Sequence, residues 1–287
     1  MKIKKALITA AGPSQRELPL QTLIDKDRKK RTVLEILVNE IQSAGIEEIG
    51  IVVQKADVNR FEEVIEASSI SGVQFIPQSE KKGYGHALLS GAEFINNQPF
   101  LHLVGDHLYV NRSGDNVTKQ LVEMAEKQNC SISTVQPTRE NAIGNYGTIK
   151  AERIQGDTNI FQIKKVKEKP TPTYAEQNLM VSGLRAGYYL CFYGMHVFTP
   201  VLLELLEKRA KEFPDEKLGL SESLNDLAQK SKYLAIEQNN IRYDIGLDYG
   251  LLKAQLALSL SGQDRDYLMS ELLQFFVEKD LKNKGVS

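Results

Sequence analysis

Cysteine is scarce in this sequence of 287 residues, which contains only Cys130 and Cys191. Two cysteines are too few for a disulfide framework, and their wide separation excludes a CxxC metal site. We expect both to be buried as small apolar side chains in a protein of the reducing cytoplasm.

A charge excess is also missing, because 36 Lys and Arg residues face 37 Asp and Glu residues and the formal net charge is −1. A general nucleic-acid binder needs a basic excess to neutralise phosphates, so nucleic acid is not expected as a partner. With 41% hydrophobic and 25% charged residues, the composition is that of a globular protein.

Long hydrophobic runs are absent as well. The longest apolar stretch, residues 184–198, is interrupted by Arg185, Gly187, Gly194 and His196. A membrane-spanning helix needs about 20 apolar residues, so no membrane association is expected. The short apolar run behind the basic N-terminus leads into a glycine turn, which is typical of a strand rather than of a targeting segment. A cytoplasmic location follows as an expectation.

The first half of the sequence alternates short apolar runs with amphipathic stretches. Strands are predicted at residues 5–9, 49–53, 73–76, 100–104 and 131–136, and helices at 33–44, 61–67, 85–94 and 117–128. This alternation predicts an α/β fold with a Rossmann-like mixed, mostly parallel sheet flanked by helices.

After about residue 144 the pattern changes. Two strands around a turn, at 146–153 and 160–169, predict a hairpin, and a loop rich in Pro and Thr follows at 170–174. Later elements are extended segments at 195–198, 234–237 and 241–243, and helices at 201–213, 249–260 and 264–281. The last helix carries a broad apolar face, which belongs either to the core or to an oligomer contact.

Glycines follow two of the predicted strands. Gly12 ends the first strand with Arg16 close behind, and such a turn suits a phosphate because its backbone N–H groups point outward and the arginine can pair with the anion. Structural turns with the same pattern are commoner. Gly83 and Gly85 open a helix after Gln78, which favours close approach of the backbone to a ligand.

Carboxylates follow other predicted strands. Asp106 comes directly after the buried strand 100–104, at the sheet edge where such folds bind ligands and metals. Asp244 follows a later extended segment. Glu168 and Lys169 end the hairpin, where they are either part of a site or a solvated strand end.

In this order the motifs resemble those of the sugar-phosphate nucleotidyltransferases, and most of all the bacterial UTP–glucose-1-phosphate uridylyltransferase type. The most specific pieces are KGYGHA at 82–87, KEKP at 167–170 and YDIG at 243–246. The resemblance covers about residues 3–260. It implies the nucleotide-diphospho-sugar transferase fold, with a catalytic domain at 1–260 and a C-terminal helix at 261–287 as a candidate homo-oligomer contact.

The resemblance also implies an activity. A uridylyl group passes from UTP to a hexose 1-phosphate, with glucose 1-phosphate as the first candidate, giving UDP-sugar and pyrophosphate with Mg²⁺ as cofactor. The nucleotide half would span about residues 1–140 and the sugar half about 141–260. Such a reaction needs little covalent help from the protein, and depends on positioning and on neutralising phosphate charge.

Roles for individual residues follow from the same resemblance. In the nucleotide half, Ala11 and Gly12 would hold the nucleotide through backbone groups, Gln78 and Gly83 would read uracil, and Asp106 would join them.

The remaining implied roles concern the sugar, the metal and the reacting phosphates. Gly147, Glu168 and Gly194 would line the sugar site, where Lys169 would pair with the sugar phosphate; Asp106 and Asp244 would hold the metal; Arg16 and Lys169 would stabilise developing charge.

Two departures from the family pattern stand in the first loop. The family's Gly-x-Gly-Thr-Arg reads Gly12-Pro13-Ser14-Gln15-Arg16 here, so a glycine and a backbone donor are lost. The family also carries a Pro-Lys pair some ten residues later. An ungapped alignment makes Lys26 that catalytic lysine, whereas a rival register aligns residues 23–25 with the following strand and leaves no lysine. Residues 12–39 form a shorter segment than in the family, and the basic run at 26–31 either compensates for this difference or forms a solvated loop.

Two other functions stay open at this point. The altered first loop suits a catalytically silent paralogue that binds UDP-sugar, although the retained Arg16, Asp106, Lys169 and Asp244 argue against it. A nucleotidyltransferase with another base or sugar is the third interpretation, because epimeric sugars differ by a single hydroxyl.

Overall fold

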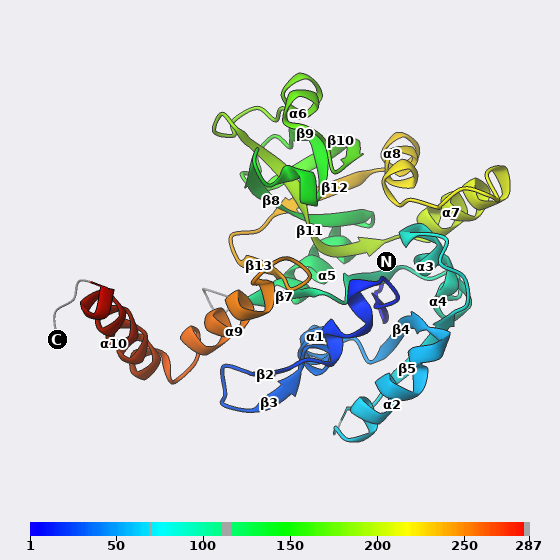
Figure 1. Ribbon diagram of the computed structural model, residues 1–287. Coiled ribbons are helices and arrows are strands. Elements are labelled where there is room, and N and C mark those ends of the chain that lie inside the picture. Colours follow the sequence, from blue (N-terminus) through cyan, green and yellow to red (C-terminus); the bar gives the residue numbers. More distant parts are fainter. Residues whose placement is uncertain (69, 111–115, 284–287) are drawn as a thin grey trace.

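The computed structural model describes residues 1–68, 70–110 and 116–283. In this part of the chain a nine-stranded sheet runs through the molecule in the order β5-β4-β1-β6-β11-β8-β12-β10-β9 (Figure 1). Its strands are β1 (Lys5–Thr9), β4 (Glu48–Gln54), β5 (Val73–Gln78), β6 (Phe100–Val104), β8 (Ser131–Arg139), β9 (Gly147–Arg153), β10 (Ile160–Glu168), β11 (Tyr188–Phe198) and β12 (Tyr233–Glu237).

Two small ribbons stand beside the main sheet. β2 (Thr22–Ile24) pairs with β3 (Lys30–Thr32), and β7 (His107–Val110) pairs with β13 (Ile241–Asp244), each antiparallel. The α-helices are α1 (Val33–Ser43), α2 (Val58–Glu66), α3 (Tyr84–Ser90), α4 (Ala92–Ile95), α5 (Val117–Gln128), α6 (Pro172–Asn178), α7 (Val201–Glu212), α8 (Ser221–Lys230), α9 (Gly250–Leu260) and α10 (Arg265–Asn283).

The mixed α/β fold is as predicted, but the expectation of a mostly parallel sheet is wrong. β5, β4, β1 and β6 are parallel neighbours, as the strand-helix alternation of the first half indicated. β11 then runs antiparallel to β6, β8 and β9, and β10 runs antiparallel to β9 and β12. The reason is local: the second half is built from the β9–β10 hairpin and the long strand β11, which need no helical crossover.

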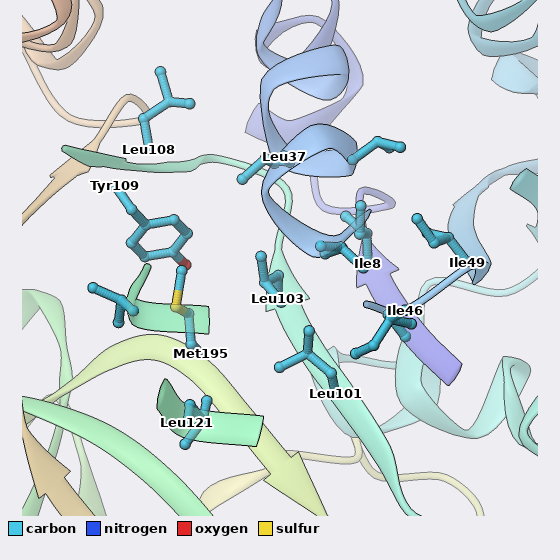
Figure 2. Packing of buried hydrophobic residues seen from close by; sticks show 14 of the residues in the cluster. Ile8, Leu37, Ile46, Ile49, Leu101, Leu103, Leu108, Tyr109, Leu121 and Met195 are labelled. Atoms are coloured by element: carbon cyan, nitrogen blue, oxygen red, sulfur yellow. The ribbon is translucent and has the colours of Figure 1, made fainter. Parts of the chain in front are cut away.

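Alternation along the central strands divides the core into two layers. Ile8 and Leu103 face α1 and α5 on one side of the sheet (Figure 2), whereas Leu7 and Phe100 face the other side, which α3, α7 and α8 cover. This follows from the period of two in a strand, which sends neighbouring side chains to opposite faces. Both cysteines are buried, as predicted.

Several element boundaries differ from the sequence-based expectation. The predicted loop at 170–174 contains the start of α6, which Thr171 caps through a hydrogen bond from the Tyr174 amide. The strand at 195–198 is the end of the longer β11. β7 and α8 were not predicted. The polar residues of α8, such as Ser221 and Asn225, carry little helical signal and obtain their order from packing on β10.

The C-terminal helix α10 extends away from the sheet beyond α9 (Figure 1). Its apolar side chains Tyr267, Leu273 and Phe276 are exposed, so the prediction that this face belongs to the core is wrong. The alternative, an oligomer contact, stays a prediction; Leu281 lies outside the described side chains. No helix within the described ranges is long and apolar enough to span a membrane.

The side chain of Gln255 on α9 joins the C-terminal part of the chain to the first hairpin. Its amide oxygen accepts a hydrogen bond from the Ile24 N–H at 3.0 Å, and its amide nitrogen donates to the Ile24 carbonyl at 3.0 Å. Gln255 therefore pairs with both backbone groups of one residue of β2, as a neighbouring strand would.

The segment between α7 and α8 is fastened to the glycine pair of the KGYGHA motif. The Leu218 N–H donates to the Lys82 carbonyl at 2.7 Å, and the Leu218 carbonyl accepts from the Gly85 N–H at 2.9 Å. Gly83 has φ +102°, and a Cβ added there would lie 2.6 Å from the Leu218 oxygen. The two glycines thus admit another stretch of backbone, which is a structural reason for their presence.

Gly83→Ala therefore combines two costs, a left-handed φ and a backbone clash. Gly45 is the matched control, because its φ is +85° but nothing lies within 4 Å of an added Cβ. We expect Gly45→Ala to cost about 1–2 kcal/mol, the usual penalty of a left-handed alanine, and Gly83→Ala about 3 kcal/mol or more. Urea denaturation of both variants measures the difference. Equal losses would contradict the proposed contact with Leu218.

Candidate active site

The parallel pairing of β1 with β6 brings two predicted site residues to one edge of the sheet. Thr9 is the register partner of Val104, so the loops that follow, containing Gly12 and Asp106, leave the sheet side by side. Gly105 lies so close to the Thr9 carbonyl that an added Cβ would be 2.9 Å from its oxygen. The register is thereby fixed at the point where the site begins.

Two adjoining cavities open at this edge. The larger has a volume of about 560 Å³ and the smaller about 290 Å³. Tyr84, Val104 and Glu168 line both of them, so a ligand that extends from one cavity reaches the other. Cavities of this size and concave shape are typical of small-molecule sites.

The larger cavity contains four of the five residues predicted to bind the nucleotide; the fifth, Asp106, is not among the lining residues of either cavity. Ala11, Gly12, Gln78 and Gly83 line it, together with Lys169. The sequence did not single out three further lining residues, Gln54, Lys81 and Lys217, and Lys217 is brought here by the Leu218 contacts. Three lysines at one cavity favour an anionic ligand.

Lys169, one of the four residues predicted to bind the sugar, lines the larger cavity, whereas the smaller cavity brings together the other three and Asp244, which was predicted to bind the metal. Gly147, Glu168, Gly194 and Asp244 line it, although almost 100 residues separate the first from the last. An added Cβ at Gly147 would lie 2.9 Å from the Phe192 ring, and Gly194 has φ +95° at a bulge of β11. Both glycines therefore keep space free or allow a bend that an ordinary residue would prevent.

Glu168 is held in place by Ser221, whose hydroxyl donates to its Oε2 at 3.0 Å. Ser221 lies at the start of α8 and was not identified from the sequence. Lys169, the next residue, has φ +43°, an uncommon conformation for a residue with a side chain. Exposed residues such as Arg28 also have a positive φ, so it is the position of Lys169 at the larger cavity that separates it from a plain solvated strand end.

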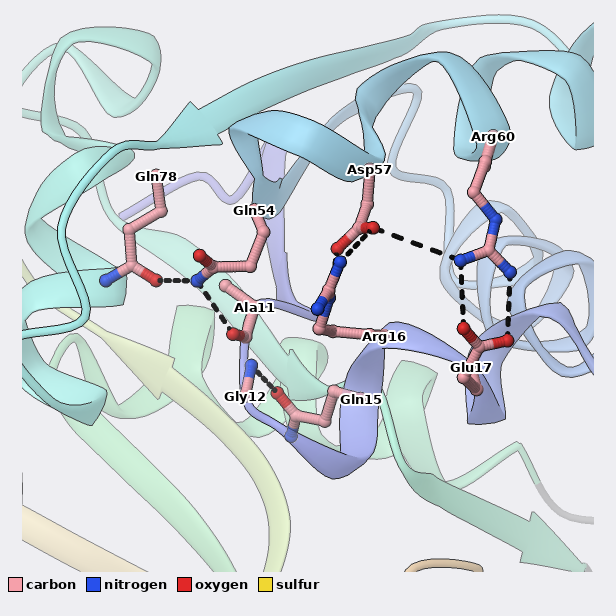
Figure 3. Close-up of polar contacts among 9 residues, drawn as sticks. All are labelled: Ala11, Gly12, Gln15, Arg16, Glu17, Gln54, Asp57, Arg60 and Gln78. Atoms are coloured by element: carbon pink, nitrogen blue, oxygen red, sulfur yellow. Dashed lines mark hydrogen bonds and ion pairs between the residues drawn. The ribbon is translucent and has the colours of Figure 1, made fainter.

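The side chains of Gln78, Gln54 and His86 form a chain of hydrogen bonds (Figure 3 shows its first part). The Gln54 amide donates to the Ala11 carbonyl at 2.9 Å and to the Gln78 oxygen at 3.3 Å, and the Gln78 amide nitrogen contacts His86 Nδ1 at 3.0 Å. Gln78 is buried and fixed at both ends. One N–H and one lone pair of its amide stay available to a ligand.

Tyr84, which lines both cavities, is positioned by the buried His102. The Nδ1 of His102 can only donate to the Leu7 carbonyl, at 2.9 Å, so Nε2 accepts from the Tyr84 hydroxyl at 2.6 Å. Burial lowers the pKa of His102 to about 4, against a smaller raising effect of the Leu7 hydrogen bond. His102 is thus neutral at pH 7 and holds one tautomer. Sequence reasoning did not single out Tyr84. Its position inside the KGYGHA motif is the feature of the sequence that could have identified it as a site residue.

Asp106 and Asp244 converge at Gly246. An added Cβ at Gly246 would lie 3.2 Å from Asp244 Oδ1 and 3.5 Å from Asp106 Oδ2, so the two oxygens are no further apart than the sum of those distances. Two oxygens that bind one Mg²⁺ lie at most about 4.2 Å apart, twice the metal–oxygen distance of about 2.1 Å. The bound therefore places both carboxylates at the same point of the site, and a shared ion requires them to lie closer together than this bound. The pairing of β7 with β13 produces this convergence.

The ionisation of Asp244 suits a cation ligand. Burial acts to raise its pKa, but the hydrogen bond and charge of His107, the Gly246 amide and Arg242 together hold the pKa below its usual range. Two carboxylates with room for waters and phosphate oxygens fit Mg²⁺, which rarely has an all-protein cage. No cluster of three or more His, Cys, Asp or Glu side chains suited to a metal occurs among residues 1–68, 70–110 and 116–283.

Arg16 is bound to protein and not turned to either cavity. Its Nε and Nη2 donate to the two oxygens of Asp57 at 2.5 and 2.7 Å, and Arg60 links Asp57 to Glu17 (Figure 3). The Asp57 side chain is only 3% exposed and requires a cationic partner. The predicted contact of Arg16 with a phosphate has no support in this geometry.

Lys26 lies in the turn of the β2–β3 hairpin, where it is exposed and lines neither cavity. Residues 22–24 form a strand, in agreement with the rival register that leaves no lysine at the family's position. The expected solvated loop at 26–31 is partly wrong, since residues 30–32 form β3. A catalytic role of Lys26 stays a prediction that the structure does not support.

The Arg16–Asp57 pair generates a prediction about acid stability. The hydrogen bond from Arg16 is the main cause that lowers the pKa of Asp57, against the raising effect of burial. A carboxyl with a lowered folded pKa stabilises the fold above its unfolded pKa, about 3.9, and this contribution is lost as pH falls through the folded value.

We expect Asp57→Asn to lower the free energy of unfolding by about 1–2 kcal/mol at pH 7, with the loss shrinking below pH 4. Urea denaturation between pH 3 and 7 measures it, with Asp157→Asn at an exposed turn as control. A loss that stays constant down to pH 3 would argue against the pair.

The UTP–glucose-1-phosphate uridylyltransferase of Staphylococcus epidermidis is 27% identical over a 303-residue alignment that covers 97% of this chain and 98% of the relative. A crystal structure of a UDP-glucose pyrophosphorylase complexed with UDP-glucose shares 24% identity with a TM-score of 0.71, covering 89% of this chain and 98% of the other.

The UTP-bound enzyme of Acinetobacter baumannii shares 20% identity with a TM-score of 0.72, covering 95% of this chain and 99% of the other. The two solved structures establish that the fold is shared. A family model described as nucleotidyl transferase matches residues 5–259. The chain therefore belongs to the nucleotidyl transferase family.

Proposed function

We propose that the protein transfers a uridylyl group from UTP to a hexose 1-phosphate, most readily glucose 1-phosphate. The observation that carries this proposal is the pair of adjoining cavities that share Glu168, with Gly12 and Gln78 in one and Gly147 and Gly194 in the other. The identity of about 27% to uridylyltransferases adds support.

In the proposed reaction an oxygen of the sugar phosphate attacks the α-phosphorus of UTP in line. The bond from that phosphorus to the bridging oxygen of pyrophosphate breaks, and pyrophosphate leaves with the electron pair. The protein's part is to align the two phosphates and to offset their charge. Lys169 lies at the larger cavity next to Glu168, which lines both cavities, so it can pair with the sugar phosphate near the attacked atom.

The base would be held in the larger cavity and the sugar in the smaller one. The free N–H and lone pair of the Gln78 amide match the alternating acceptor and donor groups of a uracil edge. Glu168, kept in place by Ser221, offers carboxylate oxygens to sugar hydroxyls. Asp106 and Asp244 would hold Mg²⁺, which when bound offsets phosphate charge.

A screen of nucleotides and sugars tests the proposal. Pyrophosphate release is measured for UTP, TTP, CTP, ATP and GTP, each with glucose, galactose, mannose and N-acetylglucosamine 1-phosphates. We expect UTP to be preferred over ATP and GTP at least tenfold, about 1.4 kcal/mol, and glucose 1-phosphate to react fastest. Equal turnover with GTP would contradict uridylyl transfer.

The second candidate is a silent UDP-sugar-binding protein. The side chain of Gln15 on the Gly12 amide favours it, because an amide normally free for phosphate is already engaged. Binding of UDP-glucose without turnover of any pair in the screen would establish this alternative and exclude catalysis.

Asp106→Asn tests the carboxylate pair. Removing one negative charge takes away a candidate Mg²⁺ ligand while relieving the repulsion between two nearby carboxylates. We expect metal-dependent turnover to fall at least about 100-fold, on the scale of losing a main electrostatic group, with thermal stability equal to or above that of the wild type. Asp157→Asn, at an exposed turn, is the control. Full activity of Asp106→Asn would exclude the proposed metal site.

A further inference from the structure

The side chain of Gln15 connects the Gly12 turn, the proposed phosphate contact, with Asp106, the proposed metal ligand. Its Oε1 accepts a hydrogen bond from the Gly12 N–H at 3.1 Å (Figure 3), and its Nε2 donates to Asp106 Oδ1 at 3.0 Å. The partners fix this orientation, because an N–H can only meet the amide oxygen and a carboxylate can only meet the amide nitrogen. Gln15 also lines the larger cavity and is half-buried.

The amide lies directly over the glycine. A Cβ added at Gly12 would lie 3.0 Å from Gln15 Oε1 and 3.2 Å from its Cδ. The Gln15 N–H also donates to the Gly12 carbonyl at 3.0 Å, so the turn folds back on itself. A phosphate oxygen cannot approach the Gly12 N–H while this amide is in place.

Each end of the amide imitates one component of a metal–nucleotide complex. The oxygen takes the donor that a phosphate oxygen would use, and the nitrogen presents hydrogens to the carboxylate that a cation would neutralise. We propose that Gln15 substitutes for phosphate and metal in the ligand-free site and is displaced when they bind. This inference rests on the proposed function, because it takes Gly12 and Asp106 as the phosphate and metal contacts.

The bridge has a consequence for affinity. To bind, the nucleotide must replace the hydrogen bond between Gln15 and the Gly12 N–H, and the hydrogen bond between Gln15 and the Asp106 carboxylate is lost at the same time. The free energy of this displacement is subtracted from the free energy of nucleotide binding. When the amide oxygen of Gln15 leaves the Gly12 N–H, its amide nitrogen leaves Asp106 as well. Gln15 therefore weakens the binding of nucleotide without metal, and it replaces the threonine that the family pattern has at this position.

Two variants of Gln15 give opposite results if this is correct. Gln15→Thr shortens the side chain and frees the Gly12 N–H, so we expect UTP to bind about fivefold more tightly in the presence of a chelator, the scale of one exchanged hydrogen bond. Gln15→Glu keeps the size of the side chain but places a negative charge beside the Gly12 N–H, where the phosphates of UTP would bind and be repelled. We expect it to bind UTP at least about fivefold more weakly under the same conditions.

Isothermal titration calorimetry of the full chain with UTP in a chelator measures both affinities. Gln21→Ala, at an exposed position outside both cavities, is the control and should leave the affinity unchanged. Gln15→Ala provides a second deletion if the threonine variant does not fold, and circular dichroism checks each protein.

The outcomes separate this inference from the proposed function. Tighter binding by Gln15→Thr or Gln15→Ala together with weaker binding by Gln15→Glu supports the displacement. Unchanged or weaker binding by the threonine and alanine variants overturns the displacement, because Gln15 would then be a structural or ligand-binding group. In that case UTP binding by the wild type still leaves the proposed function intact. A wild type that binds no UTP, with or without Mg²⁺, would overturn the proposed function and this inference with it.

Discussion

The site depends on the parallel pairing of β1 with β6. Their register places the ends of both strands at the same edge of the sheet, and the Gly105 N–H seals it with a hydrogen bond to the Thr9 carbonyl at 2.9 Å. From this edge the chain supplies the Gly12 turn on one side and Asp106 on the other. A shift of one residue in either strand would reverse the faces of its side chains and separate these groups.

The antiparallel half of the sheet supplies the remaining residues of the site, after the Gly12 turn and Asp106 of the parallel half. β11 lies against β6, and its bulge around Gly194 bends the strand where the smaller cavity lies. The β9–β10 hairpin delivers Gly147 and Glu168 to the same place. The change from parallel to antiparallel pairing thus coincides with the boundary between the two cavities, and Glu168 lines both sides of it.

Local patterns predicted local structure well and long-range pairing poorly. The limits of β1, β6 and α5 were predicted to the residue, because an apolar run or an apolar helical period ends there, with Gly105 after β6 and Asn116 and Asn129 on either side of α5. The resemblance placed Gly147, Glu168 and Gly194 at one site, and the fold brings these three to one cavity. The partners of Arg16 and Gln15 were not predictable, since Asp57 and Asp106 lie 41 and 91 positions away in the sequence, and only the folded sheet decides which carboxylate each side chain meets.

The pairing of Gln255 with Ile24 has a consequence for the order of folding. It joins positions 231 residues apart, and the β7–β13 ribbon joins positions 131 to 137 residues apart, from Ile241 with Val110 to Asp244 with His107. Closing such long loops is entropically costly and slow, so these contacts form late. On the ribosome, the Gly12 turn and β6 emerge well before Asp244 and α9 are made. Until then the edge of β2 lacks its side-chain partner and stays open to pairing with another nascent chain.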